Sequence, residues 1–199
     1  MIGIIDYGAG NLTSVSNALT YIGAQNIISA DRDTLLAADQ IILPGVGAFG
    51  DAMASLKKCG LVNTVYDAVE SGKPFMGICL GMQLLFEDSE ESPGVAGLGI
   101  LKGHIVKFPS DMGLKVPQIG WNHLTCLQPD SIYHCADGKF VYFVHSYYLQ
   151  ADDPSVVAAT ADYGKTFHAA VSSRNISASQ FHPEKSGEVG LSILKSWVG

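Results

Sequence analysis

A cysteine flanked by glycines is the first feature of the sequence that could carry out chemistry. Cys79 lies in the segment Gly77-Ile78-Cys79-Leu80-Gly81, after an apolar run and directly before a helical pattern. This spacing is the thiol counterpart of the Gly-x-Ser-x-Gly elbow, in which a sharp strand-to-helix turn lifts a nucleophile above a sheet. The free amides at the start of the helix would favour a thiolate, and the Leu80 amide would point to a developing oxyanion. The alternative is a buried structural cysteine, since free cysteine behaves as a small hydrophobic residue.

A thiol nucleophile needs a base, and one histidine has a carboxylate at a suitable spacing. His182 lies in Phe181-His182-Pro183-Glu184. Pro183 favours an extended backbone at His182, and a spacing of two in an extended segment puts both side chains on one side. Glu184 could then accept the imidazole N–H and stabilise the charged ring. We expect the other histidines to be surface, strand or packed residues: His104, His123, His134, His145 and His168.

The elements that must position these residues alternate in the first part of the chain. Short apolar strands are predicted at residues 2–5, 27–30, 40–43 and 75–78. Helices are predicted after Asn11, which could cap a helix that ends at Gly23, and from Leu61 to Glu70, with an amphipathic stretch between residues 30 and 40. Short apolar strands that alternate with helices predict a parallel sheet covered on both faces.

The pattern changes after about residue 95. The segments that look extended are residues 99–108, 116–125, 140–149, 156–161, 168–173 and 176–181, and a helix is predicted at 185–198. Strands that follow alternating units predict antiparallel strands that extend the parallel core or pack beside it. The chain has no internal repeat, low-complexity tract or linker, so we expect a single domain over residues 1–199.

The composition excludes several classes of protein. With 12 basic and 19 acidic residues the net charge is -7, and no basic stripe is present, which disfavours nucleic-acid binding. No apolar run reaches the roughly 18 residues needed to span a membrane. The first basic residue is Arg32, so we expect no signal peptide and a cytoplasmic protein with reduced thiols. The cysteines lack the paired spacing of zinc sites, and Gly8-Ala9-Gly10 lacks the dinucleotide spacing, so we expect no metal and no cofactor.

Taken together, the two motifs resemble those of a known family. Gly-x-Cys-x-Gly-x-Gln at residues 77–83, followed about a hundred residues later by Gln-Phe-His-Pro-Glu at 180–184, is similar to the class I (triad) glutamine amidotransferases over the whole chain. Residues 5–12, 43–49 and 117–122 further resemble the glutaminase subunits of imidazole glycerol phosphate synthase, and residues 143–147 and 183–187 fit as well. One departure is Ala178, where those proteins have glycine. We expect it to affect strand packing and not chemistry.

The resemblance implies a fold and a set of site residues. The fold would be α/β, with a flavodoxin-like, mostly parallel sheet, helices on both faces and added antiparallel strands in the C-terminal half. The implied triad is Cys79, His182 and Glu184. The implied oxyanion hole is formed by Leu80, Val46 and Gly47, and the residues implied to contact glutamine are Gly45, Gln83, Ser146 and Tyr147.

The resemblance also implies a partner. The chain would form a heterodimer with a (β/α)8-barrel cyclase of the HisF type and pass ammonia to it. The cyclase would make imidazole glycerol phosphate and an aminoimidazole carboxamide ribonucleotide (AICAR) in histidine biosynthesis. The positions implied at or near this interface are Trp121, Asn122, Tyr142 and Lys185. From the sequence alone, Trp121 and Tyr142 could equally be core residues, and Lys185 a solvated residue at a helix start.

These residues imply a mechanism by covalent catalysis. The Cys79 thiolate attacks the carboxamide carbon of glutamine, His182 delivers a proton to the departing ammonia, and water hydrolyses the glutamyl thioester. We expect low activity without the partner, with the Val46 amide pointing away until its loop rearranges. Two alternatives stay open: a related subunit that serves surface-polysaccharide synthesis, and a catalytically silent scaffold. A free cysteine peptidase has similar chemistry, but no feature of the sequence indicates a peptide groove.

Overall fold

Four parallel strands form the N-terminal half of the main sheet. The computed structural model describes all 199 residues. The strands are β1 (Ile2–Ile5), β2 (Asn26–Ser29), β3 (Gln40–Gly45) and β4 (Phe75–Cys79). They lie in the order β2–β1–β3–β4, and every neighbouring pair is parallel. The parallel sheet predicted from the alternating pattern is therefore confirmed.

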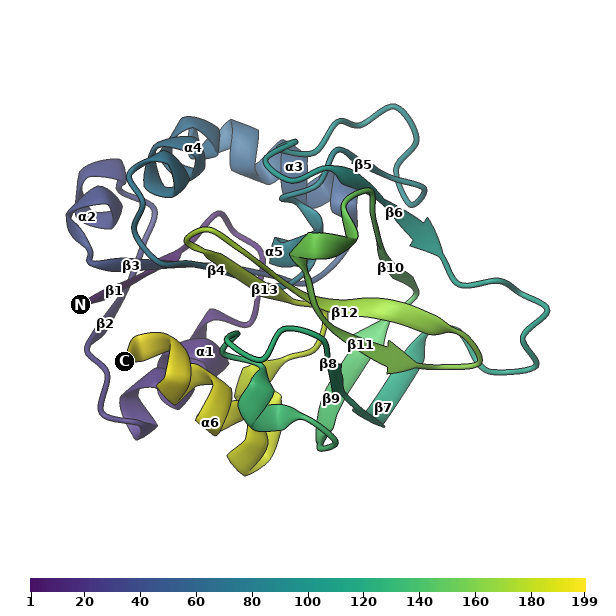
Figure 1. Ribbon diagram of the computed structural model, residues 1–199. Helices are drawn as coiled ribbons and strands as arrows, with labels where there is room; N and C mark the ends of the chain where they lie inside the picture. The colour runs from purple at the N-terminus through teal and green to yellow at the C-terminus, as the bar shows by residue number, and fades with distance from the viewer.

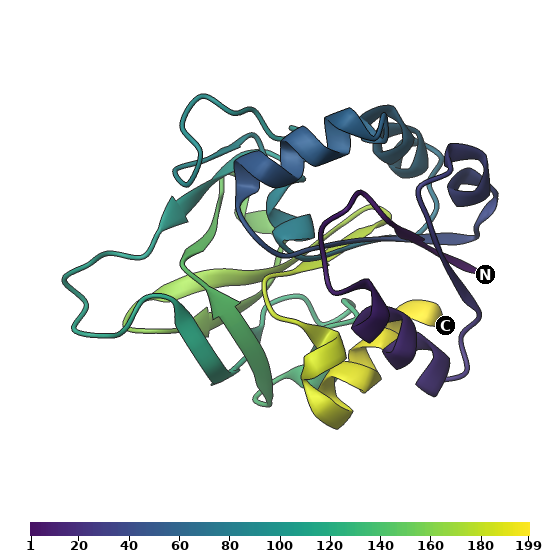
Figure 2. The same cartoon turned by 180° about the vertical axis from the view of Figure 1, so that it is seen from behind.

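Helices cover both faces of this sheet (Figure 1). One face carries α2 (Arg32–Ala37), α3 (Phe49–Lys58) and α4 (Val62–Glu70), and the other carries α1 (Leu12–Tyr21) and α6 (Gly187–Val198), as both views show (Figure 2). Side chains of β3 alternate between the two layers: Ile41 and Leu43 pack in the cluster under α2, α3 and α4, and Ile42 packs in the cluster with α1 and α6. Burial on both faces explains the uninterrupted apolar runs.

The helix starts differ in where their caps come from. The Asn11 side chain accepts a hydrogen bond from the Ser14 amide at the start of α1, as predicted. Helix α3 was not predicted, and no side chain of its own caps it. Glu91 and Ser92 instead accept hydrogen bonds from the first amides of α3, at 2.8 and 2.9 Å. Because this cap comes from a loop about forty residues away, the local sequence carries no start signal.

The rest of the main sheet is largely antiparallel. Its further strands are β5 (Asp88–Ser89), β6 (Gly103–Lys107), β8 (Thr125–Cys126), β10 (Tyr147–Ala151), β11 (Val157–Asp162), β12 (Thr166–Ser173) and β13 (Ile176–Ser179). The sheet continues from β4 in the order β13–β12–β10–β6–β5, and β11 pairs with β12 and β8. A separate two-stranded antiparallel sheet consists of β7 (Gln118–His123) and β9 (Phe140–His145). The added antiparallel strands are thus confirmed.

Two details of the C-terminal half differ from the predictions. Strand β13, predicted with the antiparallel group, pairs in parallel with β4 and antiparallel with β12. It therefore joins the parallel core to the antiparallel extension. The predicted extended segment 140–149 is divided at Ser146, so that β9 and β10 belong to different sheets. An aromatic cluster that includes Phe108, Phe143 and Phe167 fills the space between these sheets.

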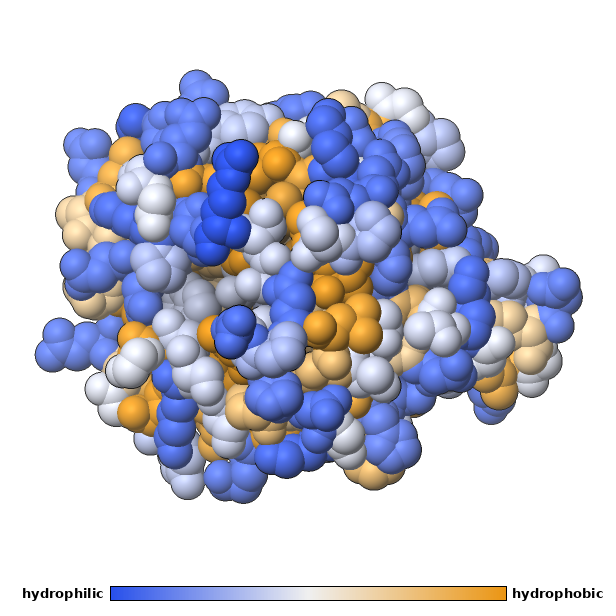
Figure 3. Space-filling model, viewed as in Figure 1, coloured by the Kyte–Doolittle hydropathy of each residue, from blue (hydrophilic) through white to orange (hydrophobic).

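The remaining elements are short. Helix α5 (Leu80–Gln83) follows β4 directly, and three 3₁₀ turns are η1 (His134–Ala136), η2 (Pro154–Val156) and η3 (Pro183–Lys185). The final helix, predicted from residue 185, begins at Gly187 after η3. None of the helices combines the length and the apolar character that crossing a membrane requires. Hydrophilic side chains cover most of the face in Figure 3, with apolar side chains gathered near the middle of the view.

Candidate active site

Cys79 lies at the sharp turn between β4 and α5. Its backbone has φ 55° and ψ -112°, a conformation that costs a non-glycine residue about 1–3 kcal/mol. The flanking glycines allow this turn because neighbouring backbone leaves no space for a side chain. A Cβ at Gly81 would lie 1.9 Å from the Leu43 carbonyl oxygen, and one at Gly77 would lie 3.0 Å from Met82. The predicted elbow geometry is therefore present at this cysteine.

The helix after the elbow is shorter than the sequence pattern indicates. Helix α5 has four residues, so its macrodipole is smaller than that of a long helix. The first amides of the turn still lack intrahelical partners, and Leu80 supplies one of them. The amides of Val46 and Gly47 donate no hydrogen bond to a backbone carbonyl. The elbow can thus offer backbone N–H groups even though its helix dipole is weak.

His182 and Glu184 form a buried pair. The ring Nδ1 of His182 lies 2.8 Å from Oε1 of Glu184, and the two side chains are 2% and 1% exposed. His182 is extended, with φ -102° and ψ 99°, and Pro183 starts the turn η3 directly after it. The second ring nitrogen, Nε2, is buried and has no hydrogen-bond partner within the chain. The carboxylate therefore orients the ring and leaves Nε2 available.

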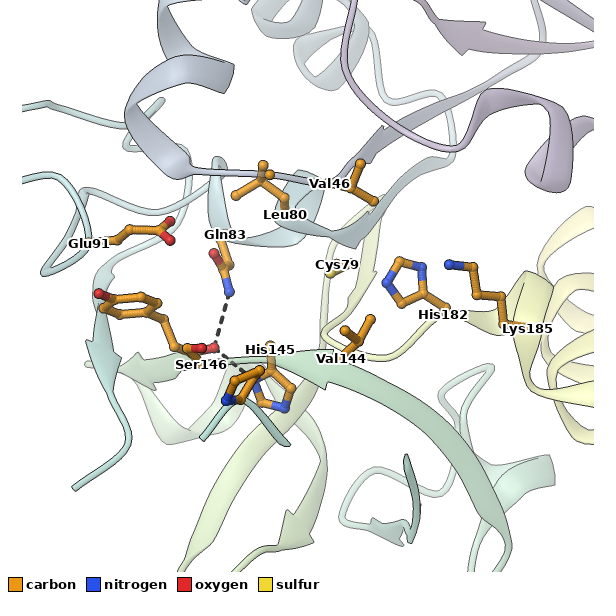
Figure 4. Close-up of a pocket in the computed structure, with 13 residues that line it drawn as sticks. Val46, Cys79, Leu80, Gln83, Glu91, Val144, His145, Ser146, His182 and Lys185 are labelled. Atoms are coloured by element: carbon orange, nitrogen blue, oxygen red, sulfur yellow. Dashed lines mark hydrogen bonds between the residues drawn. The ribbon is translucent and has the colours of Figure 1, made fainter. Parts of the chain in front are cut away.

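Charges around His182 favour its protonated form. Burial alone lowers the pKa of His182, but the Cys79 sulfur and the Glu184 carboxylate outweigh burial and raise this pKa above its usual range. Cys79 and His182 line the same cavity, as Figure 4 shows. The structure thus brings together a cysteine and a histidine that lie about a hundred residues apart in the chain.

A cavity of about 400 Å³ opens over these residues. Its walls come from the ends of β3, β4, β9 and β10, and from η3. The lining residues are Val46, Gly47, Cys79, Leu80, Gln83, Glu91, Pro117, Val144, His145, Ser146, Tyr147, His182 and Lys185. Seven residues that the resemblance assigned outside the triad are among them. A cavity of this size suits a small polar molecule such as an amino acid.

Two of the residues predicted for the triad, the oxyanion hole and glutamine binding do not line the cavity. Gly45 lies behind its wall, where an added Cβ would be 2.6 Å from the Tyr7 hydroxyl and 2.9 Å from the Gly81 amide. Glu184 lies behind His182, toward α1 and α6, and is linked to the cavity through its bond to the ring Nδ1. Gly45 therefore acts here by permitting close packing of β3 against the elbow.

Glu91, Gln180 and His145 are functional candidates that the sequence reasoning missed. Glu91 lies at one end of the cavity, near Gln83, and Lys185 lies beyond His182 at the other end (Figure 4). Gln180 is fully buried next to Cys79, with 3.7 Å between its side-chain nitrogen and the sulfur. Glu91 follows no periodic pattern, and Gln180 was noted only as part of a motif. The signal for Gln180 was its place two residues before His182.

His145 is packed, as the sequence predicted, but it also lines the cavity. Its Nδ1 lies 2.7 Å from the Tyr147 carbonyl oxygen and its Nε2 lies 2.9 Å from the Gln118 side chain. Burial lowers the pKa of His145 to about 4, so the ring is neutral near neutral pH. A carbonyl only accepts, so Nδ1 carries the proton of the neutral ring. Nε2 faces the side-chain oxygen of Gln118, whose NH₂ group donates to Asn122 at 2.8 Å.

The residues predicted for a partner surface lie on the neighbouring elements β7, β9 and η3, and of them only Lys185 lines the cavity. Trp121 and Tyr142 are paired across β7 and β9 with ring centroids 5.8 Å apart. Trp121 is 51% exposed, so the core alternative for this residue is wrong. Asn122 donates a hydrogen bond to the Asp162 carbonyl at 2.7 Å. Lys185 lies in the turn η3 before the last helix, where it is exposed and lines the cavity, which agrees with either prediction for this residue.

The one group of residues that could share a metal ion lies outside the cavity. Ligand atoms of Glu87, His104 and Asp152 are within 4.8 Å of one another at the edge formed by β5 and β6. Glu87 already accepts hydrogen bonds from Lys102 and from the Gly103 amide, at 2.8 and 3.1 Å. This group is therefore a charge network that an ammonium already neutralises.

Comparison with known proteins gives consistent results. Residues 3–198 match the family described as glutamine amidotransferase class-I. The chain is 50% identical over 198 residues to the imidazole glycerol phosphate synthase subunit HisH of Methanothermobacter thermautotrophicus, covering 100% of this chain and 98% of that protein. It is 52% identical to the subunit of the same name from Syntrophotalea carbinolica, covering 99% and 98%.

Solved structures show the same fold at lower identity. A crystal structure of a glutamine amidotransferase superposes with a TM-score of 0.77 at 20% identity, covering 100% of this chain and 99% of that one. A chain in the structure of PurLQS from Thermotoga maritima superposes with a TM-score of 0.76 at 22% identity, covering 99% and 96%. The α/β fold predicted from the sequence is therefore confirmed.

Proposed function

Because the chain belongs to the class I glutamine amidotransferases, we propose that it is the glutaminase subunit of an imidazole glycerol phosphate synthase. It hydrolyses glutamine to glutamate and ammonia with Cys79, His182 and Glu184, as a single amidotransferase domain. The ammonia passes to a HisF-type cyclase subunit, which makes imidazole glycerol phosphate and AICAR. The observation that carries the proposal is the cavity that joins Cys79 to the buried His182–Glu184 pair.

Glutamine fits the cavity in one direction. The carboxamide must reach Cys79, so the amino-acid end lies toward Gln83, Ser146 and Tyr147. Glu91 lies at that same end and presents a carboxylate to the α-ammonium group of the substrate. Because Glu91 holds the α-ammonium group at one end of the cavity, the carboxamide carbon of glutamine lies over the Cys79 sulfur.

The chemistry follows from the charges at the elbow. The Cys79 thiolate attacks the carboxamide carbon, and backbone N–H groups of Leu80, Val46 and Gly47 stabilise the oxyanion. The His182 imidazolium donates its proton to the leaving ammonia, while Glu184 holds the ring by its other nitrogen. Water then enters, His182 takes a proton from it, and the thioester is hydrolysed to glutamate.

The partner binds over the face that contains the cavity. Trp121 is an exposed aromatic side chain on β7, and Ile119 and Phe140 beside it are also exposed, at 63% and 50%. Aromatic anchors of this kind dominate protein interfaces. Tyr142 pairs with Trp121 and Lys185 lines the cavity, so ammonia released at Cys79 leaves toward the bound cyclase. Asn122, the next residue on β7, points to the other side of the strand and acts there by holding the Asp162 carbonyl. Both subunits work in the cytoplasm, where the thiol stays reduced.

The Val46–Gly47 segment limits the activity of the free subunit. The amides of Val46 and Gly47 donate no backbone hydrogen bond, so the direction in which they point is not fixed. The free chain therefore has low glutaminase activity, which rises when the cyclase and its ribonucleotide bind. A ribonucleotide of the histidine pathway should stimulate turnover, and its failure to do so would point to a surface-polysaccharide pathway.

The decisive experiment removes the nucleophile in the assembled enzyme. Cys79→Ser should abolish release of glutamate without weakening the complex with the cyclase, because Cys79 is buried and the variant replaces only its sulfur by oxygen. Cys59→Ser is the matched control, since Cys59 is exposed and lies outside the cavity, and it should retain activity. Full glutaminase activity of Cys79→Ser would overturn the proposal. So would the loss of activity in both variants.

A further inference from the structure

Gln180 is a buried amide in contact with the nucleophile. Its side-chain Nε2 lies 3.7 Å from the Cys79 sulfur, within the range of an N–H···S hydrogen bond. Its side-chain oxygen Oε1 accepts a hydrogen bond of 2.9 Å from Nε2 of Gln83. Gln180 is 0% exposed and does not line the cavity, so it cannot serve as a direct substrate ligand. Its contacts are directed at the sulfur and at Gln83.

The hydrogen-bond partners fix which end of the Gln180 amide faces the sulfur. The chain of bonds starts at the Tyr147 backbone carbonyl, which can only accept, and the Gln83 NH₂ group donates to it at 3.2 Å. The same NH₂ group donates its second hydrogen to Gln180, so the Gln180 oxygen must face Gln83. The Gln180 NH₂ group is then left facing Cys79. A flipped amide would bring two NH₂ groups together and break the chain.

The backbone holds Gln180 in this place. It follows β13 directly, and its amide donates a hydrogen bond of 2.8 Å to the Ala169 carbonyl on β12. Strand β13 is itself paired in parallel with β4, which carries Cys79 at its end. The donor and the sulfur are therefore attached to two hydrogen-bonded neighbouring strands, and their separation does not depend on a loop.

We propose that the Gln180 amide is a second hydrogen-bond donor to the Cys79 thiolate, and that Gln83 fixes its orientation. This inference rests on the proposed function of Cys79 as the nucleophile. An amide N–H stabilises a thiolate more than a thiol, because the bond to a charged acceptor is stronger. Unlike His182, the amide cannot transfer a proton, so it holds the sulfur charged without taking part in proton transfer. Gln180 thus contacts the reacting atom and acts as a fixed electrostatic group.

The test measures the charge state of Cys79 directly. The full chain, in complex with its cyclase, is alkylated with iodoacetamide over a range of pH, and modification of the Cys79 peptide is followed by mass spectrometry. The pH of half-maximal alkylation reports the thiolate, while the plateau rate reports access. The titratable groups around the sulfur and in the cavity are His182, Tyr7, His145, Tyr147, Glu91 and Lys185, and no variant below removes any of them.

Gln180→Met removes the donor and keeps a side chain of similar length. The pH of half-maximal alkylation should rise by about one unit, which below that pH corresponds to about tenfold slower alkylation. Gln83→Leu leaves Gln180 in place but removes its orienting donor, so it should shift the midpoint in the same direction by less. It also serves as the test if Gln180→Met does not fold.

Asn175→Leu is the matched control. Asn175 is a partly buried amide that precedes β13, but its donors bind the Val69 and Lys73 carbonyls, and it lies at the end of the strand away from the sulfur. It should leave the midpoint unchanged, and the exposed Cys59 should alkylate equally in every variant.

A midpoint of Gln180→Met equal to that of the wild type would overturn the inference, even if glutamine turnover were lost. An equal shift in Asn175→Leu would also overturn it, because the effect would then be one of general packing. Alkylation needs no turnover, so this result is independent of the glutaminase assay of Cys79→Ser. The thiolate inference and the proposed function can therefore fail separately.

Discussion

Replacing Glu184 by glutamine removes a negative charge from behind His182 and hardly changes the shape of the side chain. The Glu184 carboxylate lies 2.8 Å from Nδ1 of His182, and both side chains are almost completely buried. In Glu184→Gln the amide oxygen can still accept the Nδ1 proton, so the ring stays in place. What the variant loses is the attraction between the carboxylate and the imidazolium.

The structure sets the size of this loss. A hydrogen bond to a charged group contributes about 1.5–3 kcal/mol, against about 0.5–1.5 kcal/mol between neutral groups, which gives the lower limit. Two opposite charges about 4 Å apart attract each other by about 4 kcal/mol at an effective dielectric constant near 20, which gives the upper limit for a buried pair. Since each 1.4 kcal/mol is about tenfold in rate, kcat should fall about 10- to 1000-fold.

The assay is steady-state release of glutamate by the complex with its cyclase, with glutamine varied and pH scanned. KM should stay unchanged because Glu184 does not line the cavity. The alkaline limb of the pH profile should move to lower pH, because one of the two groups that raise the pKa of His182 is gone. Glu188→Gln, at an exposed position one turn later, should behave like the wild type. A kcat within a few-fold of wild type, or a rise in KM that accounts for the loss, would refute the role of Glu184.

Three further changes test other parts of the structure. Gly81→Ala should prevent formation of the elbow, because its methyl group would lie 1.9 Å from a backbone oxygen. Gly23→Ala is the control: the position has φ 84° and open space around it, so the variant should lose only about 1 kcal/mol of stability in urea unfolding. Burial lowers the pKa of His145 to about 4, so the unfolded chain takes up this proton first. The free energy of unfolding therefore decreases as pH falls from about 6.5 toward 4. In His145→Asn this decrease should be smaller by up to about 3 kcal/mol, measured by urea unfolding at the two pH values. Trp121→Ala should weaken binding of the cyclase by about 2 kcal/mol in titration calorimetry and leave the stability of the free chain unchanged, and an unchanged affinity would remove Trp121 from the interface.

The parallel half of the fold is predictable because its signals are local. Strands β1 to β4 are short apolar runs, and α1 has its own cap in Asn11. Helix α3 lacks a local signal because its cap comes from Glu91 and Ser92. Helix α5 ends early because the next amides, of Leu85 and Phe86, bond three residues back. Residues 80–86 are almost all apolar, so the sequence has no helical periodicity from which the end of α5 could be predicted.

The site residues also divide into those with a local sequence signal and those without one. Cys79, His182 and Glu184 stand in short motifs, where the spacing itself carries the chemistry. Glu91 and the contact between Gln180 and the sulfur depend on which strands become neighbours. Period and composition distinguish a strand from a helix, but they do not say that β13 pairs in parallel with β4.

The position of β13 makes the active site one of the last parts of the molecule that can form. This strand enters the middle of the sheet, between β4 and β12, although it is the final strand of the chain (Figure 1). During synthesis the nucleophile emerges early, but its base arrives only when nearly the whole chain has been made. Nascent or truncated chains would therefore hold an unpaired cysteine and consume no glutamine. Pairing of β13 with β4 joins segments that are about a hundred residues apart, and such long-range pairing is slow. We therefore expect the insertion of β13 between β4 and β12 to limit the rate of folding.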